Sequence, residues 1–172
     1  MRILATAALI AALPFAGSAQ ETAPSPARNG AVFGDWTLRC VAEGVGETTC
    51  ALVQRLAQAE TNAFVAEVGL SRVATAEGDR TLIAVVTPEG TALNLRPAYL
   101  IDEAVEQVAL TWRTCANGRC RAAAVLTDGQ EAALKAGERM TLAYQFFGQA
   151  APLRLPLSLS GVTAGLTALG GD

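Results

Sequence analysis

The chain has 172 residues but contains no histidine, and only 5% of its residues are aromatic. Histidine is the side chain that most often acts as a general base near neutral pH, and it is the commonest metal ligand. Its absence excludes a Ser-His-Asp or Cys-His nucleophilic pair and any histidine-bound metal. The glycine-rich phosphate and dinucleotide motifs are also missing. We therefore predict no catalytic residue, no metal and no cofactor.

Charge is sparse and mixed in sign. The chain has 13 lysines and arginines against 16 acidic residues, which gives a net charge of −3. There is no basic stripe and no run of five like charges. This pattern argues against nucleic acid or an anionic membrane surface as a partner.

The only long apolar run lies at the N-terminus. Arg2 precedes an apolar run at residues 3–15, and small residues at positions 17 and 19 then form a cleavage site after Ala19. This order predicts a cleaved signal peptide at residues 1–19. The run is shorter than the roughly 20 residues that a membrane-spanning helix needs. The rest of the chain has no such run, so we expect a periplasmic, outer-membrane-associated or secreted protein that does not span the membrane after cleavage.

Residues 20–31 are small and polar and include two prolines. They predict a flexible lead-in. No internal repeat or interior linker follows. The remaining residues, 32–172, are therefore expected to form a single domain.

Alternation of apolar and polar residues with a period of two dominates this domain, as in half-buried β-strands. Pro156 cannot donate a ladder hydrogen bond, so its strand should lie at an edge or contain a bulge. We predict an all-β, antiparallel β-sandwich, with a small barrel as the alternative. The predicted strands include residues 36–40, 64–70, 82–86, 108–112, 140–146 and 153–159.

Helical signals are confined to one or two short turns. Asp128 and Glu131 have the spacing of a capping box, and Gly137 would end the helix that follows. Residues 162–169 could form a second short turn or a frayed tail.

The four cysteines are expected to form structural disulfides. Asn117-Gly118 predicts a type I′ hairpin turn, which places Cys115 opposite Cys120 in a non-hydrogen-bonded pair. Their Cα atoms would then lie about 4.5 Å apart, within the range of a disulfide. Cys40 and Cys50 remain and can pair across a loop rich in glycine and glutamate. A redox or metal site is the weaker interpretation, because neither pair has the Cys-x-x-Cys spacing.

Two further groups of residues are candidates for chemistry or binding. Asp102, with Glu103 and Glu106, could supply a carboxylate pair for a hydrolase, although a solvated acidic loop explains the same residues. Most aromatic residues fall on the apolar phase of a strand. Phe33, Tyr99 and Phe147 are the ones expected to be partly exposed, and they are candidate binding anchors together with Asp102.

Several segments, taken in order, resemble the invasion-associated locus B family of bacterial exported proteins. They are Phe33-Gly34-Asp35-Trp36, Cys40 and Cys50, residues 86–90 and 99–102, the Cys115–Cys120 segment, and residues 155–161. The resemblance extends over about residues 32–169. No single segment is specific to this family. The ordered set of segments, together with both cysteine pairs, is fairly specific to it.

The resemblance implies an immunoglobulin-like β-sandwich in the periplasm or at the outer membrane. It also implies a role, in some intracellular pathogens, in entry into host cells. The family has no established catalytic residues to transfer. We therefore expect a non-catalytic envelope protein that binds an envelope or host-surface protein. The alternatives are a periplasmic small-ligand carrier, which needs an apolar cavity, and a carboxylate-based hydrolase, which needs carboxylates facing each other in a cleft.

Overall fold

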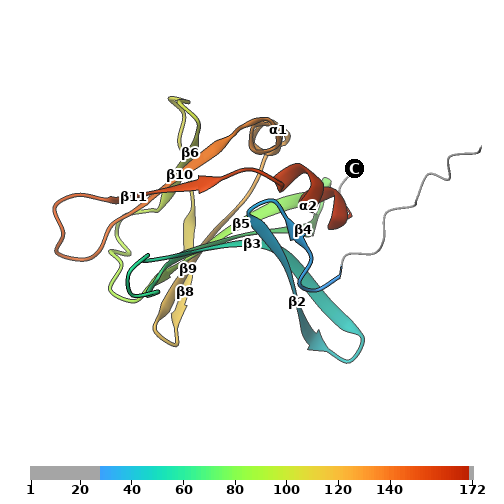
Figure 1. The fold of residues 1–172 in the computed structure, drawn as a ribbon, viewed down its shortest axis with the longest axis horizontal. Helices are drawn as coiled ribbons and strands as arrows, with labels where there is room; N and C mark the ends of the chain where they lie inside the picture. Colours follow the sequence, from blue (N-terminus) through green and yellow to red (C-terminus); the bar gives the residue numbers. More distant parts are fainter. Residues whose placement is uncertain (1–27, 171–172) are drawn as a thin grey trace, which may run out of the picture.

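The computed structural model describes residues 28–170. The predicted signal peptide, residues 1–19, and most of the predicted lead-in lie outside these residues. The described chain forms two antiparallel β-sheets and two short helices, which lie together near one end of the molecule (Figure 1).

The larger sheet has seven strands, in the order β1-β2-β3-β4-β5-β9-β8. Its first five strands are consecutive in the sequence and pair as a meander. The bounds are β1 (Val32–Phe33), β2 (Trp36–Gly44), β3 (Glu47–Ala57), β4 (Phe64–Thr75), β5 (Gly78–Pro88), β8 (Thr111–Ala116) and β9 (Arg119–Val125).

The smaller sheet has four strands, in the order β11-β10-β6-β7. The bounds are β6 (Ala98–Ile101), β7 (Val108–Ala109), β10 (Arg139–Tyr144) and β11 (Leu153–Ser158), and the helices are α1 (Asp128–Ala136) and α2 (Val162–Ala168). The prediction of an antiparallel β-sandwich of immunoglobulin-like architecture with one or two short helical turns is confirmed. Pro156 lies on β11, an edge strand, as predicted.

The core fills the space between the two sheets. Trp36 on β2 is fully buried, and its indole N–H donates to the Ser158 carbonyl of β11 at 2.9 Å. The Gln54 amide donates to the same carbonyl at 3.1 Å, and the Tyr144 hydroxyl of β10 donates to the Val65 carbonyl at 2.8 Å. These bonds join the sheets at separate points, so they fix the relative position of the two layers as well as satisfying buried polar groups.

The prediction of a single strand at residues 108–112 is wrong. The chain pairs with β6 at Val108, passes through the buried Leu110, and then pairs with β9 from Thr111 onward. One alternating segment thus supplies a strand to each sheet. The alternation survives because both sheets share one interior, toward which Val108, Leu110 and Trp112 all pack.

Helix α1 begins one residue earlier than the sequence predicts. Its N-cap is Thr127, whose hydroxyl accepts from the Gln130 N–H, while the Gln130 side chain accepts from the Thr127 N–H. This is a capping box, but Thr127 and Gln130 form it in place of Asp128 and Glu131. Gly137 is the C-cap, as predicted.

Glu131, which does not take part in the capping box, fixes α1 to the larger sheet. Its carboxylate forms a two-pronged ion pair with the Arg72 guanidinium, at 3.0 and 3.2 Å, and accepts from the Thr81 hydroxyl. Lys135 on α1 lies 2.8 Å from the same carboxylate. Burial alone would raise the pKa of Glu131, but the hydrogen bonds from Lys135, Thr81 and Arg72 outweigh it and lower that pKa to about 2.

Helix α2 is packed on the sandwich, so the alternative of a frayed tail at residues 162–169 is wrong. Val162 and Leu166 are fully buried, and Gly165 is buried. A Cβ at Gly165 would lie inside contact distance of the Leu52 side chain of β3. The absence of a side chain at Gly165 therefore lets the helix approach the larger sheet closely.

A second close approach joins the start of the domain to the residue before α2. Gly161 is the N-cap of α2 and has a φ of 93°. A Cβ at Gly161 would clash with the Phe33 backbone, and a Cβ at Gly34 would clash with the Ser160 backbone. The Asp35 N–H donates to the Ser160 carbonyl at 3.2 Å across this contact. Two glycines thus permit the β1–β2 turn to lie directly against the chain before α2.

Hydrogen bonds to β2 extend to residues before the predicted domain boundary at Val32. The Gly30 N–H donates to the Leu38 carbonyl, and the Leu38 N–H donates to the Ala31 carbonyl, both at 2.8 Å. The Asn29 side chain accepts from the Cys40 N–H. These residues belong to the predicted lead-in but are hydrogen-bonded to β2.

Candidate binding surface

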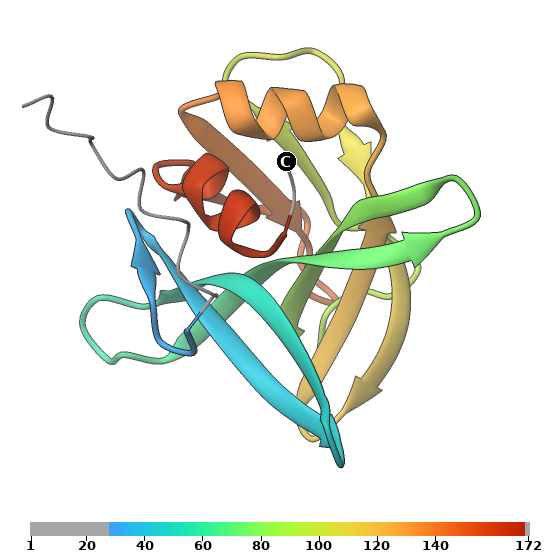
Figure 2. The same ribbon diagram turned by 90° about the vertical axis from the view of Figure 1, so that its right-hand side faces the viewer.

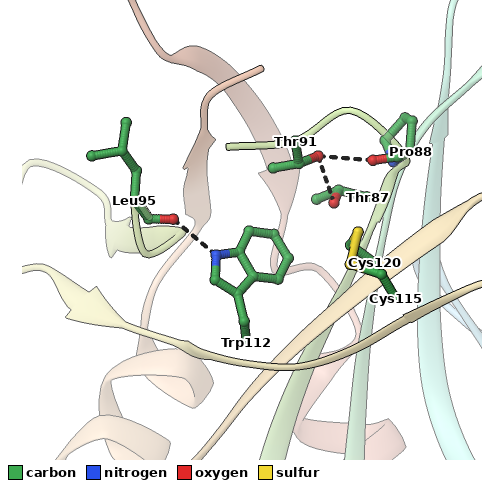
Figure 3. The surroundings of a disulfide bond; sticks show 7 residues. All are labelled: Thr87, Pro88, Thr91, Leu95, Trp112, Cys115 and Cys120. Carbon is green, nitrogen blue, oxygen red and sulfur yellow. Dashed lines mark hydrogen bonds between the residues drawn. A yellow bond between two sulfur atoms is a disulfide. The ribbon is translucent and has the colours of Figure 1, made fainter. Parts of the chain in front are cut away.

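The hairpin between β8 and β9 has the geometry that the sequence predicts. Asn117 and Gly118 have positive φ values of 52° and 74°, as a type I′ turn requires. Cys115 lies opposite Cys120 with a Cα–Cα distance of 4.0 Å, and the two form a disulfide (Figure 3). Cys120 faces the interior and is buried, whereas Cys115 is exposed. The predicted pair is confirmed.

Cys40 and Cys50 form the second disulfide, as predicted. The connection differs from the expected loop, because β2 and β3 continue past the disulfide and turn only after Gly44. The two cysteines are direct partners across these strands, with Cα atoms 4.0 Å apart. Both disulfides therefore join neighbouring antiparallel strands.

We expect removal of the Cys115–Cys120 disulfide to destabilise the protein without changing its fold. The Cys115→Ala/Cys120→Ala double variant should lose roughly 2 kcal/mol of unfolding free energy, the value for closing so short a loop. Urea denaturation under oxidising conditions measures this loss. The Cys40→Ala/Cys50→Ala variant, which opens a longer loop, should lose somewhat more. Free thiols at Cys115 and Cys120 in the exported protein would contradict the assignment of a structural disulfide.

The segment that follows β5, residues 89–97, is held against this hairpin. The Trp112 indole N–H donates to the Leu95 carbonyl at 2.9 Å, and the Thr91 hydroxyl donates to the Pro88 carbonyl at 2.8 Å (Figure 3). The buried Thr91 and Thr87 hydroxyls are 2.9 Å apart. The segment is thus fixed from both the β8 side and the β5 side, although it contains no strand of its own.

Residues 89–97 also adjoin residues 145–153, which comprise the connection from β10 to β11 and the first residue of β11. The Ala92 N–H donates to the Gln145 carbonyl and the Phe147 N–H donates to the Gly90 carbonyl, both at 2.8 Å. These two segments lie at the end of the sandwich away from the helices (Figure 1). We call residues 89–97 and 145–153 together the loop surface.

The loop surface is rich in exposed apolar side chains. Of the nine large hydrophobic residues exposed between residues 28 and 170, four lie on it, namely Leu93, Leu95, Phe147 and Leu153. Arg154 lies exposed next to it at the start of β11. Exposed apolar side chains that gather in one place, bordered by polar residues, are typical of protein interaction sites.

The three predicted aromatic anchors lie in different environments. Phe147 is 82% exposed, in agreement with the sequence. Phe33 is only half-buried but packs against the core. The prediction of a partly exposed Tyr99 is wrong, because Tyr99 is 1% exposed and points from the central strand β6 into the core. The structure therefore does not bring the three together. Exposed Leu93 and Leu95 were missed because apolar residues outside strands have no periodic signal, and Leu153 was missed because it falls on the apolar phase of a predicted strand.

The Asp102 carboxylate is engaged by the backbone. One of its oxygens accepts from the Arg139 N–H at 2.9 Å, and both lie within 3.4 Å of the Glu138 nitrogen. Asp102 has a φ of 50° where β6 ends and the loop to β7 begins, and its carboxylate fixes this turn to the start of β10. Glu103 and Glu106 are exposed in the loop that follows. These contacts explain Asp102 structurally and leave it as a poor binding anchor.

Between residues 28 and 170 there is no group of three or more cysteine or acidic side chains positioned to hold a metal ion. No helix in this same part of the chain is long and apolar enough to cross a membrane.

Comparison with known proteins places this fold. The structure is similar to the crystal structure of invasion associated protein b from Bartonella henselae, with a TM-score of 0.66 and 22% sequence identity over 81% of this chain and 92% of that one. No curated protein matches the chain. The family model "Invasion associated locus B (IalB) protein" matches residues 36–170. This match spans most of the chain, and the chain belongs to the invasion associated locus B family.

Proposed function

We propose that this protein is an exported, non-catalytic domain that binds another protein of the cell envelope or of a host-cell surface through the loop surface. The observation that carries the proposal is the gathering of exposed Leu93, Leu95, Phe147 and Leu153 on two segments that are hydrogen-bonded to each other. These bonds fix the two segments to each other, and hydrogen bonds from Trp112 and Thr91 further fix residues 89–97. A preorganised surface of this kind loses little conformational entropy when it binds.

Export is supported by the two disulfides, which persist in oxidising compartments such as the periplasm. The invasion associated locus B family supports the same location. The hydrolase alternative is weakened because the Asp102 carboxylate is occupied by backbone N–H groups.

Photo-crosslinking from Phe147 tests the proposal. We expect a benzoylphenylalanine placed at Phe147 to give a discrete protein adduct in intact envelopes or with host-cell membranes. The same group at Val45, which is fully exposed at the tip of the β2–β3 hairpin, should not give that adduct. Mass spectrometry of the adduct identifies the partner and its contact residues.

A second substitution shows whether the adduct depends on the loop surface. Adding Leu93→Ser to the Phe147 crosslinker should reduce the adduct about tenfold, because loss of one apolar anchor costs about 1–2 kcal/mol of binding. Val45→Ser should leave the adduct unchanged. Equal labelling from Phe147 and Val45, or an adduct that persists with Leu93→Ser, would show that the loop surface is not the contact.

A further inference from the structure

Four arginines gather on the outer face of the larger sheet. The smaller sheet and both helices lie on the other side of this sheet (Figure 1, Figure 2), so nothing in the described chain covers the face. Arg39 lies on β2, Arg55 on β3, and Arg119 and Arg121 on β9, and all four are exposed. We call these four residues, together with Glu67 of β4, the arginine patch. The sequence contains no basic run at these positions because the fold brings the arginines together from three strands.

The strand register places a row of these side chains on one face. Across the neighbouring strands β3, β4 and β5, Arg55 lies opposite Glu67, and Glu67 lies opposite Val86. Val86 in turn lies opposite Arg121 of β9. Direct partners on neighbouring strands point to the same side of a sheet, and strands lie about 4.8 Å apart, so Arg55 and Arg121 are roughly 14 Å apart. The row points outward, since the next residues along the strands are fully buried, namely Val68, Val85 and Ala122.

Most of the positive charge on the arginine patch is not neutralised within residues 28–170. Glu67 lies 3.5 Å from Arg39, but the other three arginines of the patch form no ion pair in this part of the chain. The Arg119 guanidinium lies 3.9 Å from the centre of the Phe64 ring, and the Arg55 guanidinium lies 5.5 Å from it. Two like charges thus lie beside one ring, where a bound anion would reduce their mutual repulsion. The patch is positive although the chain as a whole has a net charge of −3.

The surroundings of the patch narrow the class of anion. The adjoining row of outward-facing residues is small or buried, namely Val53, Gly69, Ala84 and Ala123. None of the large hydrophobic residues exposed between residues 28 and 170 lies in either row, so the patch lacks the apolar anchors that protein interfaces use. The Phe64 ring already packs against Arg119, so it is not free to stack on a nucleic-acid base. These features favour an anionic chain that needs neither an apolar anchor nor base stacking.

We propose that the arginine patch binds an acidic polysaccharide, a chain of sugars that carries carboxylate or sulfate groups. Guanidinium groups form paired, charge-assisted hydrogen bonds with such oxyanions. A sugar chain that lies across the strands presents anionic groups at intervals along its length, and these can meet Arg55 at one end of the row and Arg121 at the other. The patch shares no residue with the loop surface. The proposed binding of a protein partner and the binding of a polysaccharide therefore stand or fall separately.

Calorimetric titration with a size-defined heparin octasaccharide, which carries both sulfate and carboxylate groups, tests the site. We expect saturable binding by the protein with both disulfides formed, and the Kd should rise with salt concentration. Arg119→Gln/Arg121→Gln should raise the Kd at least about tenfold, because two charge-assisted donors are lost. Arg139→Gln/Arg154→Gln is the matched control. These two exposed arginines lie on β10 and β11 of the smaller sheet and form no ion pair within residues 28–170. Their loss removes the same charge and should leave the Kd within about twofold, since distant charges are screened.

Glu67→Gln tests the patch in the opposite direction. It removes the carboxylate among the arginines and should lower the octasaccharide Kd about two- to threefold, a change that a loss of stability would not produce. Glu103→Gln, at an exposed position in the loop after β6, removes the same charge and should leave the Kd unchanged. Equal increases in Kd for the two double arginine variants, or equal effects of Glu67→Gln and Glu103→Gln, would show that only net charge matters and would overturn the site.

Three other anions test the class of ligand. An oligoglutamate peptide and a single-stranded oligonucleotide of the same charge should bind at least about fivefold more weakly, because flexible chains lose more conformational entropy on binding. Vesicles of phosphatidylglycerol should not compete with the octasaccharide. If any of the three bound as tightly as the octasaccharide and lost this binding in Arg119→Gln/Arg121→Gln, the patch would not be specific for a polysaccharide and the proposal would be wrong.

Discussion

Gly161→Ala is expected to destabilise the protein by more than about 3 kcal/mol. A non-glycine residue at a φ of 93° costs about 1–2 kcal/mol by itself. The new methyl group would also meet the backbone of Phe33, which cannot move aside as a flexible side chain does. The contact between the β1–β2 turn and the residue before α2 should therefore open. Urea denaturation of the variant and of the unchanged protein measures the loss.

Gly78→Ala separates the two causes. Gly78 also has a positive φ, of 110°, but no atom lies within 4 Å of its Cβ. The Gly78→Ala variant should lose only the free energy of unfolding that the positive φ costs a non-glycine residue, about 1–2 kcal/mol. If the losses for Gly161→Ala and Gly78→Ala were equal, the close approach between Gly161 and Phe33 would contribute nothing to stability.

Glu131→Gln is expected to cost about 2–3 kcal/mol of unfolding free energy. The Glu131 side chain is only 17% exposed, and the substitution leaves the nearby Arg72 guanidinium partly buried without its opposite charge. The effect should appear as a lower urea midpoint with an unchanged slope. Glu77→Gln is the matched control, because Glu77 pairs with Arg80 at 3.4 Å but is 81% exposed. Such a surface pair should contribute no more than about 1 kcal/mol.

The same ion pair predicts how stability depends on pH. The pKa of Glu131 is lowered to about 2 in the folded protein, against 4.5 without the fold. Its contribution is therefore complete above pH 4.5 and is lost as the pH falls toward 2. The stability difference between the unchanged protein and Glu131→Gln should shrink over this range. A difference that stays constant from pH 6 to pH 2.5 would show that Glu131 is not held as a low-pKa carboxylate.

Local signals in the sequence predicted local structure well. Asn117-Gly118 fixed the hairpin turn, and the turn geometry then placed Cys115 opposite Cys120. Cys40 could then be paired with Cys50 because no other cysteine remained. The length of the β2–β3 hairpin could not be predicted. The sequence predicts a capping box at the start of α1, but one residue too late in the chain. Thr127 and Asp128 are both good N-caps, and the structure uses Thr127.

Features that depend on long-range packing could not be predicted. Alternation shows which residues share a face, but it does not show where a strand moves to another sheet, as the chain does at Leu110. The sequence predicts a partly exposed Tyr99 because nothing in its neighbourhood shows that β6 is an inner strand of its sheet. Arg72 and Glu131 are 59 residues apart, and no local pattern connects them.

The four outer strands of the two sheets limit how this protein can recognise another chain. Strands β1 and β7 have two residues each, β8 is irregular between Trp112 and Thr114, and Pro156 in β11 has no N–H to donate. Strands β7, β8 and β11 therefore offer no regular ladder to an incoming strand. The short β1 pairs only with Trp36 and Thr37, so the outer border of β2 beyond Cys40 has no neighbouring strand in the described chain. A partner that binds through the loop surface, as proposed, would be recognised by side chains and not by addition of a strand. The short or irregular strands β7, β8 and β11 should hinder joining from sheet to sheet at high protein concentration, which leaves β2 as the border where such joining would start.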